Sequence, residues 1–166
     1  MLGLVLSLVV ALTSHATATQ AHASGFPIKG KVVPGKSIGA VSLGLTEAEV
    51  RARWGRNFTL CKSCTQLTWL YTYRGGEPLG AAVKFVNNKV VAVFTLGSPA
   101  GWGLTGIEMG DPVSNVYNLF GNTGTAQCIG YDALYVRIGT STTAFYSAAG
   151  VIYGYALTAP TQSVCQ

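Results

Sequence analysis

Alternation of apolar and polar positions predicts β-strands along much of this chain. In residues 68–74 every second side chain is aromatic, namely Trp69, Tyr71 and Tyr73. Residues 80–96 contain two apolar runs on either side of Asn87 and Asn88, a pattern that predicts a hairpin with a two-residue turn. Similar patterns predict three later strands, in residues 133–139, 142–147 and 150–157.

Residues 41–55 carry the pattern of a short helix with defined ends. Thr46 and Glu49 form a T-x-x-E capping box, in which each side chain satisfies a backbone N–H at the start of the helix. Val50 and Trp54 are four residues apart and therefore share one face of the helix. Gly55 suits the left-handed position that follows the last turn.

A second helix of this kind is predicted further along the chain, because residues 39–55 align with residues 105–121 without a gap. Asp111 is the predicted cap, Pro112 is expected at the first helical position, and Gly121 ends the helix. The charged residues of the first helix are replaced by apolar or neutral residues in the second. What repeats is the cap, the apolar face and the final glycine, so we interpret the motif as a structural device rather than an active site.

The strands that follow each helix extend this similarity, because residues 81–96 lie over residues 142–157. We therefore predict an α+β fold of two tandem repeats, residues 24–97 and 98–166. Each repeat is expected to contain a short helix followed by an antiparallel sheet of three to four strands, and the two repeats to pack as one pseudo-symmetric domain. The G-x-G-x-x-G match at residues 101–106 is interpreted as the linker between them, with Trp102 as a buried plug.

The first 23 residues have the composition of a signal peptide. An apolar run from Leu2 to Leu12 is followed by small residues and by an A-x-A cleavage pattern at residues 21–23. The apolar run is shorter than the roughly 20 residues that a membrane-spanning helix needs. The sequence therefore predicts a secreted, extracytoplasmic protein with no transmembrane segment in its mature chain.

Cleavage of this leader would remove both histidines, His15 and His22. A mature chain without histidine cannot build a Ser-His-Asp triad, a Cys-His pair or a histidine metal site. Six carboxylates are then the only acidic groups for catalysis. We therefore expect a protein that is not an enzyme and that holds no metal or cofactor.

The net charge of +5 is unevenly distributed. Residues 24–97 contain ten Lys or Arg against three Glu, whereas residues 98–166 contain Arg137 against three acidic residues. A basic first half favours an anionic partner such as a wall polymer, and a basic surface without a partner is the alternative. Nucleic acid is not expected as a partner of an exported chain.

Four cysteines in a chain that is expected to be exported favour disulfide bonds. Cys61 and Cys64 match the C-x-x-C redox motif, but they follow a helix and precede a strand, so no helix N-terminus lowers the pKa of their thiols. Of the three possible pairings, we favour Cys61–Cys64 and Cys128–Cys165. A thiol redox role for Cys61 and Cys64 is the alternative.

Aromatic side chains on the predicted strands form the candidate binding site. In this interpretation the helices cover one face of the sheet, and the aromatic residues line the open face and recognise a protein loop or a glycan. The alternative is that they pack between the two repeats as core. The predicted binding residues are Trp69, Tyr71, Tyr73, Tyr135, Tyr153 and Tyr155.

The two predicted helix starts, residues 43–46 with Val50 and residues 109–110 with Val116, resemble those of two related groups of proteins. One is the β-lactamase inhibitor protein (BLIP) family, secreted tandem repeats of a small α/β unit with a concave sheet. The other is the BamE/SmpA group of outer-membrane assembly lipoproteins, which have one such unit. The sequence is also similar to small secreted actinobacterial proteins of unknown function. The resemblance implies the repeat fold and assigns no contact residue.

Together these features predict an exported, non-catalytic binding domain. Its expected partner is an extracellular or envelope protein, or an anionic wall polymer, recognised through the aromatic sheet face. One alternative is a β-lactamase-type enzyme inhibitor, which the resemblance alone suggests. The other is a cell-envelope glycan hydrolase in which Glu77 and Asp132 act as a carboxylate pair.

Overall fold

The structure is a computed structural model of the chain, and it describes Phe26 and residues 30–72, 80–96 and 102–166. Of the described residues, 52% lie in strands and 12% in helices. The predicted signal peptide and the boundary predicted between residues 97 and 98 lie outside the described residues. Within the described ranges, no helix is long and apolar enough to cross a membrane.

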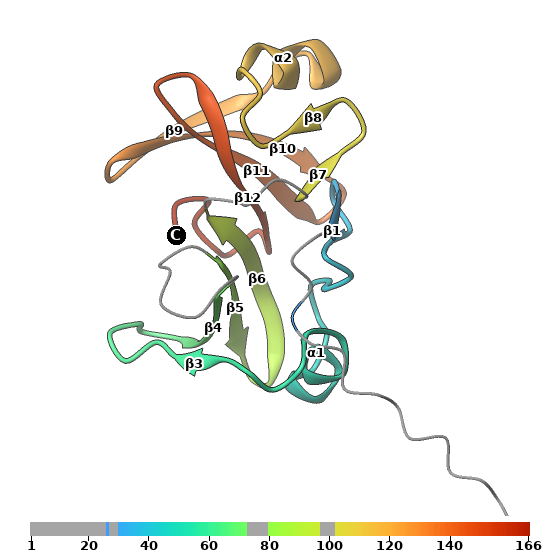
Figure 1. The fold of residues 1–166 in the computed structure, drawn as a ribbon, viewed down its shortest axis with the longest axis vertical. Helices are drawn as coiled ribbons and strands as arrows, with labels where there is room; N and C mark the ends of the chain where they lie inside the picture. Colours follow the sequence, from blue (N-terminus) through green and yellow to red (C-terminus); the bar gives the residue numbers. More distant parts are fainter. Residues whose placement is uncertain (1–25, 27–29, 73–79, 97–101) are drawn as a thin grey trace, which may run out of the picture.

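An eight-stranded antiparallel sheet forms the centre of the molecule (Figure 1). Two antiparallel runs of strands meet where β6 (Lys89–Leu96) pairs with β12 (Val151–Thr158), from Ala92 opposite Thr158 to Leu96 opposite Gly154. In order across the sheet, the strands are β3 (Thr59–Leu60), β4 (Leu67–Thr72), β5 (Gly80–Val86), β6 (Lys89–Leu96), β12 (Val151–Thr158), β11 (Ser141–Ala148), β10 (Tyr131–Ile138) and β9 (Gly124–Cys128).

A smaller four-stranded sheet lies on one side of the large sheet (Figure 1). Its inner side chains, among them Val32 and Ile107, belong to the same hydrophobic core as Val93 of β6. The β1 and β7 strands pair in parallel, and the other pairs are antiparallel. In order, the strands are β2 (Ser37–Ile38), β1 (Gly30–Val33), β7 (Trp102–Leu104) and β8 (Ile107–Glu108).

The first helix, α1 (Glu47–Trp54), has the predicted capping box. The Glu49 N–H donates to the Thr46 hydroxyl at 3.3 Å, and the Thr46 N–H donates to the Glu49 carboxylate at 2.7 Å. Val50 and Trp54 are buried on the face that the sequence predicted. Gly55 follows the helix at φ 80°. The local chemistry of this helix is therefore confirmed.

The second helix, α2 (Ser114–Phe120), begins later than predicted, and the expected cap was wrong. The Asp111 carboxylate accepts the backbone N–H of Glu108 at 2.8 Å, so it closes a turn before the helix instead of capping it. Pro112 forms a bridge to Val151 and also precedes the helix. Gly121 follows the last turn at φ 67°, as predicted.

The strands that the alternation predicts are present, although the predicted fold class is wrong. Asn87 and Asn88 form the turn between β5 and β6, with φ angles of 49° and 59°. Such positive values at both residues are typical of a two-residue hairpin turn. The three later strands that the alternation predicts correspond to β10, β11 and β12.

The predicted α+β fold of two tandem helix-plus-sheet repeats was wrong. The molecule is mostly β, and its strands form one sheet of eight strands and one of four. The pairing of β6 with β12 makes one continuous sheet of the strands assigned to separate repeats. The helices have only eight and seven residues, too few to form a layer over two sheets. The segment expected to link the two repeats instead contributes β7 to the second sheet.

The two faces of the eight-stranded sheet are covered differently. The first face packs against the helices and the small sheet with large side chains, namely Trp69, Tyr71, Val83, Val93, Phe145, Tyr155 and Leu157. The second face carries mostly small side chains, namely Ala82, Ala133, Ala144 and Ala156 with Phe94 and Tyr146. The C-terminal segment, residues 159–166, lies against this second face, where the Tyr146 hydroxyl donates to the Val164 carbonyl at 2.8 Å.

Both predicted disulfides are present. Cys61 is bonded to Cys64 between β3 and β4, and Cys128 is bonded to Cys165. The second bond joins the end of β9 to the C-terminal segment. It therefore holds that segment against the second face of the sheet.

Candidate functional site between strands β1 and β7

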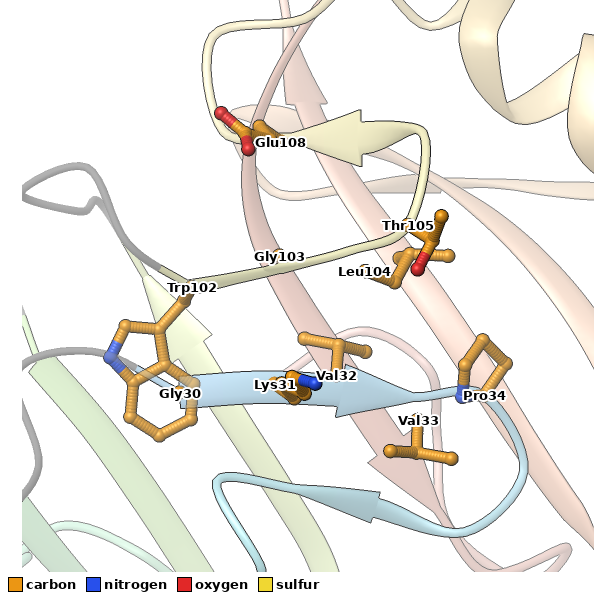
Figure 2. A pocket seen from close by; sticks show the side chains of 10 residues that line it. All are labelled: Gly30, Lys31, Val32, Val33, Pro34, Trp102, Gly103, Leu104, Thr105 and Glu108. Atoms are coloured by element: carbon orange, nitrogen blue, oxygen red, sulfur yellow. The ribbon is translucent and has the colours of Figure 1, made fainter.

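A cleft of about 460 Å³ opens between β1 and β7 of the small sheet (Figure 2). The two strands pair only at Gly30 opposite Trp102 and at Lys31 opposite Gly103. Beyond these pairs β1 continues toward Pro34, while β7 turns away into β8, so the cleft lies between diverging strands. Its volume falls within the range of small-molecule sites, about 300–1,000 Å³.

Trp102 lies at one end of the cleft, and two glycines let its ring fit there. The ring is 1% exposed and packs edge-to-face on Trp54, with the ring centroids 5.8 Å apart. Gly39 has φ +53°, and a Cβ on it would lie 2.2 Å from Cη2 of Trp102. A Cβ on Gly30 would lie 3.3 Å from the same ring. Glycine at both positions therefore allows the indole to close this end of the cleft.

Lys31, Gly103 and Glu108 form one row across three strands, because Gly103 pairs with Lys31 on one side and with Glu108 on the other. Neighbouring strands are roughly 4.8 Å apart, so the Cα atoms of Lys31 and Glu108 are roughly 10 Å apart. Gly103 has no side chain to fill the space between them. Both charged side chains are exposed, and neither forms an ion pair within the described ranges.

Apolar side chains line the open end of the cleft. Val33 is 38% exposed and lies two residues after Lys31, on the same side of β1. Pro34 follows Val33, and the half-buried Leu104 lines the cleft from β7, on the side that packs against the core. The cleft thus offers a cation, a carboxylate and an apolar wall at once. Such a combination suits a small ligand with an apolar body and charged ends.

The sequence did not predict Lys31 or Glu108 as site residues. The two are far apart along the chain and meet only through the parallel pairing of β1 with β7. The β1 strand has four residues and β7 has three, so the alternation of apolar and polar residues is too short to be recognised in the sequence. The one local signal was Gly103, part of a glycine-rich stretch that we interpreted as a linker.

Three predicted binding residues are in the core, which contradicts the open aromatic face that the prediction required. Trp69 and Tyr71 are each 1% exposed, and Tyr155 is fully buried at 0%. Phe58 stacks on Trp69 with ring centroids 4.0 Å apart, and Phe26 stacks on Tyr71 at 5.1 Å. Burial raises the pKa of Tyr71. These residues face the covering layer and stabilise the core.

Tyr135 and Tyr153 lie on the second face and are partly exposed. The shift of 66 residues that aligns residues 39–55 with 105–121 also aligns Trp69 with Tyr135, yet the two lie on opposite faces of the sheet. A difference of one residue in a strand reverses the face of every side chain, which explains the error. Burial is the main cause that raises the pKa of Tyr153, and the neighbouring Tyr131 raises it further. Tyr73 lies outside the described residues.

Of the carboxylate pair in the hydrolase alternative, the structure describes one residue. Asp132 is exposed on β10, and its proposed partner Glu77 lies outside the described residues. The Cys61–Cys64 bond lies between two strands, away from any helix N-terminus. Across the part of the chain that the structure describes, no three His, Cys, Asp or Glu residues are grouped so as to hold a metal ion.

Comparison with solved structures identifies proteins of similar fold. One is an extracellular protein containing a SCP domain from Bacillus anthracis str. Ames, with a TM-score of 0.52, 9% identity, and coverage of 94% of this chain and 50% of that chain. Another is a cysteine-rich secretory protein from Staphylococcus aureus subsp. aureus Mu50, with a TM-score of 0.52, 9% identity, and coverage of 80% and 50%. No protein-family model matches the chain, and no curated protein matches it.

At 9% identity this likeness concerns the fold alone, and the chain spans about half the length of each neighbour. The predicted resemblance to the β-lactamase inhibitor protein family and to the BamE/SmpA group was wrong, because the structural neighbours are SCP-domain proteins. The start of α1 uses general capping chemistry that many unrelated helices share, and α2 has no side-chain cap. Neither the inhibitor nor the hydrolase alternative gains support from the comparison.

Proposed function

We propose that this chain is an exported, non-catalytic binding domain whose ligand site is the cleft between β1 and β7. Three observations support export. The first 23 residues have the composition of a signal peptide. The described cysteines form two disulfides, which persist mainly in oxidising compartments. The structural neighbours are described as an extracellular protein and a secretory protein.

The row of Lys31, Gly103 and Glu108 carries the proposal for the site. A cation and a carboxylate face the same cleft, roughly 10 Å apart at their Cα atoms, with no side chain between them. A binding role fits this arrangement better than catalysis, because the cleft is lined by a single carboxylate. Glycoside hydrolysis commonly needs two.

The ligand that fits these features is a short peptide with free termini. A fully extended tripeptide spans about 10 Å, which matches the spacing of the Cα atoms of Lys31 and Glu108. Its carboxylate would lie at Lys31 and its ammonium group at Glu108. An apolar central side chain would contact Val33, which is exposed on the same side of β1 as Lys31. Peptides of this kind are present wherever extracellular or envelope proteins are degraded.

Titration of the full chain with the tripeptide Ala-Val-Ala, followed by NMR, tests this function. We expect the free tripeptide to shift the backbone signals of residues 31–33 and 103–104. The same peptide with acetylated and amidated ends is expected to bind more weakly. Lys31→Gln and Glu108→Gln should each weaken binding about fivefold, because an exposed ion pair contributes at most about 1 kcal/mol.

Lys36→Gln is the matched control for charge, since Lys36 is exposed on the same hairpin but does not line the cleft. It should leave the affinity unchanged. Equal affinity for the blocked peptide, or no effect of either cleft substitution, would reject the site. If no free tripeptide with an apolar central residue binds, the proposed ligand class is rejected, and so is the proposed binding function of this cleft.

The broader partner prediction remains a proposal beside this one. Recognition of an envelope protein or an anionic polymer through an aromatic face now concerns Tyr135 and Tyr153 alone among the described residues. Two basic side chains of residues 24–97 pack on aromatic rings of this chain. Arg51 lies over the Trp69 ring at 4.6 Å, and Lys84 lies over the Phe94 ring at 5.7 Å.

A further inference from the structure

We propose a second binding site, for an acidic saccharide, formed around Tyr135 and Arg137 on the second face of the large sheet. This inference is independent of the cleft between β1 and β7. Two hollows, each of about 450 Å³, adjoin here, and both residues line both hollows. Every residue that lines them lies in the described part of the chain.

The edge of the sheet explains why this place is open. The β9 strand pairs with β10 only as far as Gly124 opposite Tyr135. Arg137 lies two residues beyond that pair, on the same face as Tyr135, and pairs with Thr142 of β11 alone. Since the outer strand β9 ends before it, Arg137 is exposed.

The ring of Tyr135 is held in a defined position by the glycine beside it. A Cβ on Gly124 would lie 2.2 Å from Cζ of Tyr135 and 2.6 Å from its hydroxyl oxygen. The ring therefore lies across the backbone of Gly124, where any other residue would displace it. One side of the ring rests on the strand, and the tyrosine is only half-buried. Tyr135 thus presents a flat apolar surface without losing conformational entropy on binding.

The guanidinium of Arg137 lies over the Tyr135 ring, with Cζ 5.9 Å from the ring centroid, and its N–H groups form no hydrogen bond with any described residue. Arg137 is the single Lys or Arg of residues 98–166, and it forms no ion pair with any described residue. No carboxylate lines either hollow. Its donors are therefore available to an external anion, and a carboxylate accepts two of them in parallel.

Neutral hydrogen-bonding groups complete the site. Thr140 and Gln162 line the hollow under the C-terminal segment, and Asn122 lines the other. An aromatic platform, one guanidinium and several hydroxyl and amide groups suit a sugar ring that carries an acid group. The C–H bonds of the sugar pack on the negative face of the aromatic ring, while its hydroxyls exchange hydrogen bonds with the neutral groups. A simple anion would use Arg137 without Tyr135.

NMR titration of the full chain with D-glucuronate tests this site, with D-glucose and acetate as matched probes. We expect glucuronate to shift the signals of residues 135–137 and to bind at least fivefold more tightly than either probe. Arg137→Gln should weaken glucuronate binding at least fivefold, and Arg137→Lys should weaken it less. Tyr135→Phe should keep most of the affinity because the ring remains, whereas Tyr135→Leu should lose it.

Arg56→Gln removes an exposed arginine that lines neither hollow, and it should leave binding unchanged. Because Arg137 is exposed, its substitution tests the site even if Tyr135→Leu fails to fold. Three results would overturn the proposal: no binding of glucuronate, equal binding of acetate, or equal loss in Arg56→Gln and Arg137→Gln. Equal binding of acetate would identify a simple anion site instead.

Discussion

The hydroxyl of Tyr131 and the backbone of Gln166 bond to each other in both directions. The Gln166 N–H donates to the hydroxyl at 2.8 Å, and the hydroxyl donates to the Gln166 carbonyl at 3.1 Å. With the Cys128–Cys165 bond beside it, this pair fastens the C-terminal segment to the second face of the sheet. That segment in turn forms one wall of the hollow at Arg137.

Loss of the Cys128–Cys165 bond is therefore expected to cost more stability than loss of Cys61–Cys64. The two bonds close loops with sequence separations of 37 and 3 residues. Loop-closure entropy assigns about 4 kcal/mol to the first and about 2 kcal/mol to the second. Urea unfolding of the two double Cys→Ser variants measures the difference. A larger loss from the Cys61→Ser/Cys64→Ser protein would contradict the expectation.

Tyr155→Phe is expected to stabilise the protein. The Tyr155 hydroxyl is buried without a hydrogen-bond partner among the described residues, and such a group costs about 1 kcal/mol or more. Tyr71→Phe is the matched control, because the Tyr71 hydroxyl donates to the Gly55 carbonyl at 3.4 Å. The control should be neutral or slightly destabilised. Urea unfolding compares the two, and a destabilised Tyr155→Phe would show that its hydroxyl has a partner.

Gly39→Ala should be more destabilising than Gly44→Ala. Both glycines have positive φ, +53° and +81°, which costs an L-residue about 1–2 kcal/mol. A Cβ on Gly44 meets no atom within 4 Å, whereas one on Gly39 meets the Trp102 ring. The displaced indole should add about 1–3 kcal/mol to the cost. Thermal or urea unfolding measures both, and similar losses would mean that Trp102 moves without penalty.

Thr46→Ala should destabilise α1 by about 1 kcal/mol, since it removes the side-chain cap. Chemical denaturation at neutral pH provides the measurement. The equivalent substitution Asp111→Ala serves as a comparison, because Asp111 closes a turn before α2 and caps no helix. Unchanged helix content in Asp111→Ala, measured by circular dichroism, is the expected result.

The same capping box predicts a dependence on pH. Two hydrogen bonds from Thr46 lower the pKa of Glu49 below its ordinary value of 4.5. The larger effect comes from the Thr46 backbone N–H and the smaller from its hydroxyl. A lowered folded-state pKa stabilises the protein above the unfolded pKa, and that contribution is lost as the pH falls through the folded pKa. The stability difference between wild type and Glu49→Gln should thus be constant above about pH 5 and shrink below pH 4.5.

Measurement of this difference in a Thr46→Ala background provides the control. Thr46→Ala keeps the backbone N–H, the larger cause, and removes the hydroxyl, so the Glu49 pKa should rise part of the way toward 4.5 and the pH dependence should become smaller. A difference that stays constant down to about pH 3 would show that the carboxylate has the same pKa in both states.

Much of the local structure could be predicted from the sequence. The capping box at Thr46 and Glu49, the asparagine turn and the later strands follow from backbone chemistry within a few residues. The α2 start was misplaced because Asp111 satisfies a backbone N–H before the helix, which is an equally good use of its carboxylate. The aromatic site failed because alternation shows that Trp69 and Tyr71 share a face, but not which face is covered.

The short elements, the two disulfides and the charge inventory could be predicted from the sequence. The pairing of β6 with β12 in one sheet, and the parallel pairing of β1 with β7 over two residue pairs, became known only from the fold. The two groups of features differ in the range of the interactions that stabilise them. Caps and turns are fixed by neighbouring backbone groups, whereas strand pairing between distant segments depends on which faces bury together. The row of Lys31, Gly103 and Glu108 exists only through that pairing.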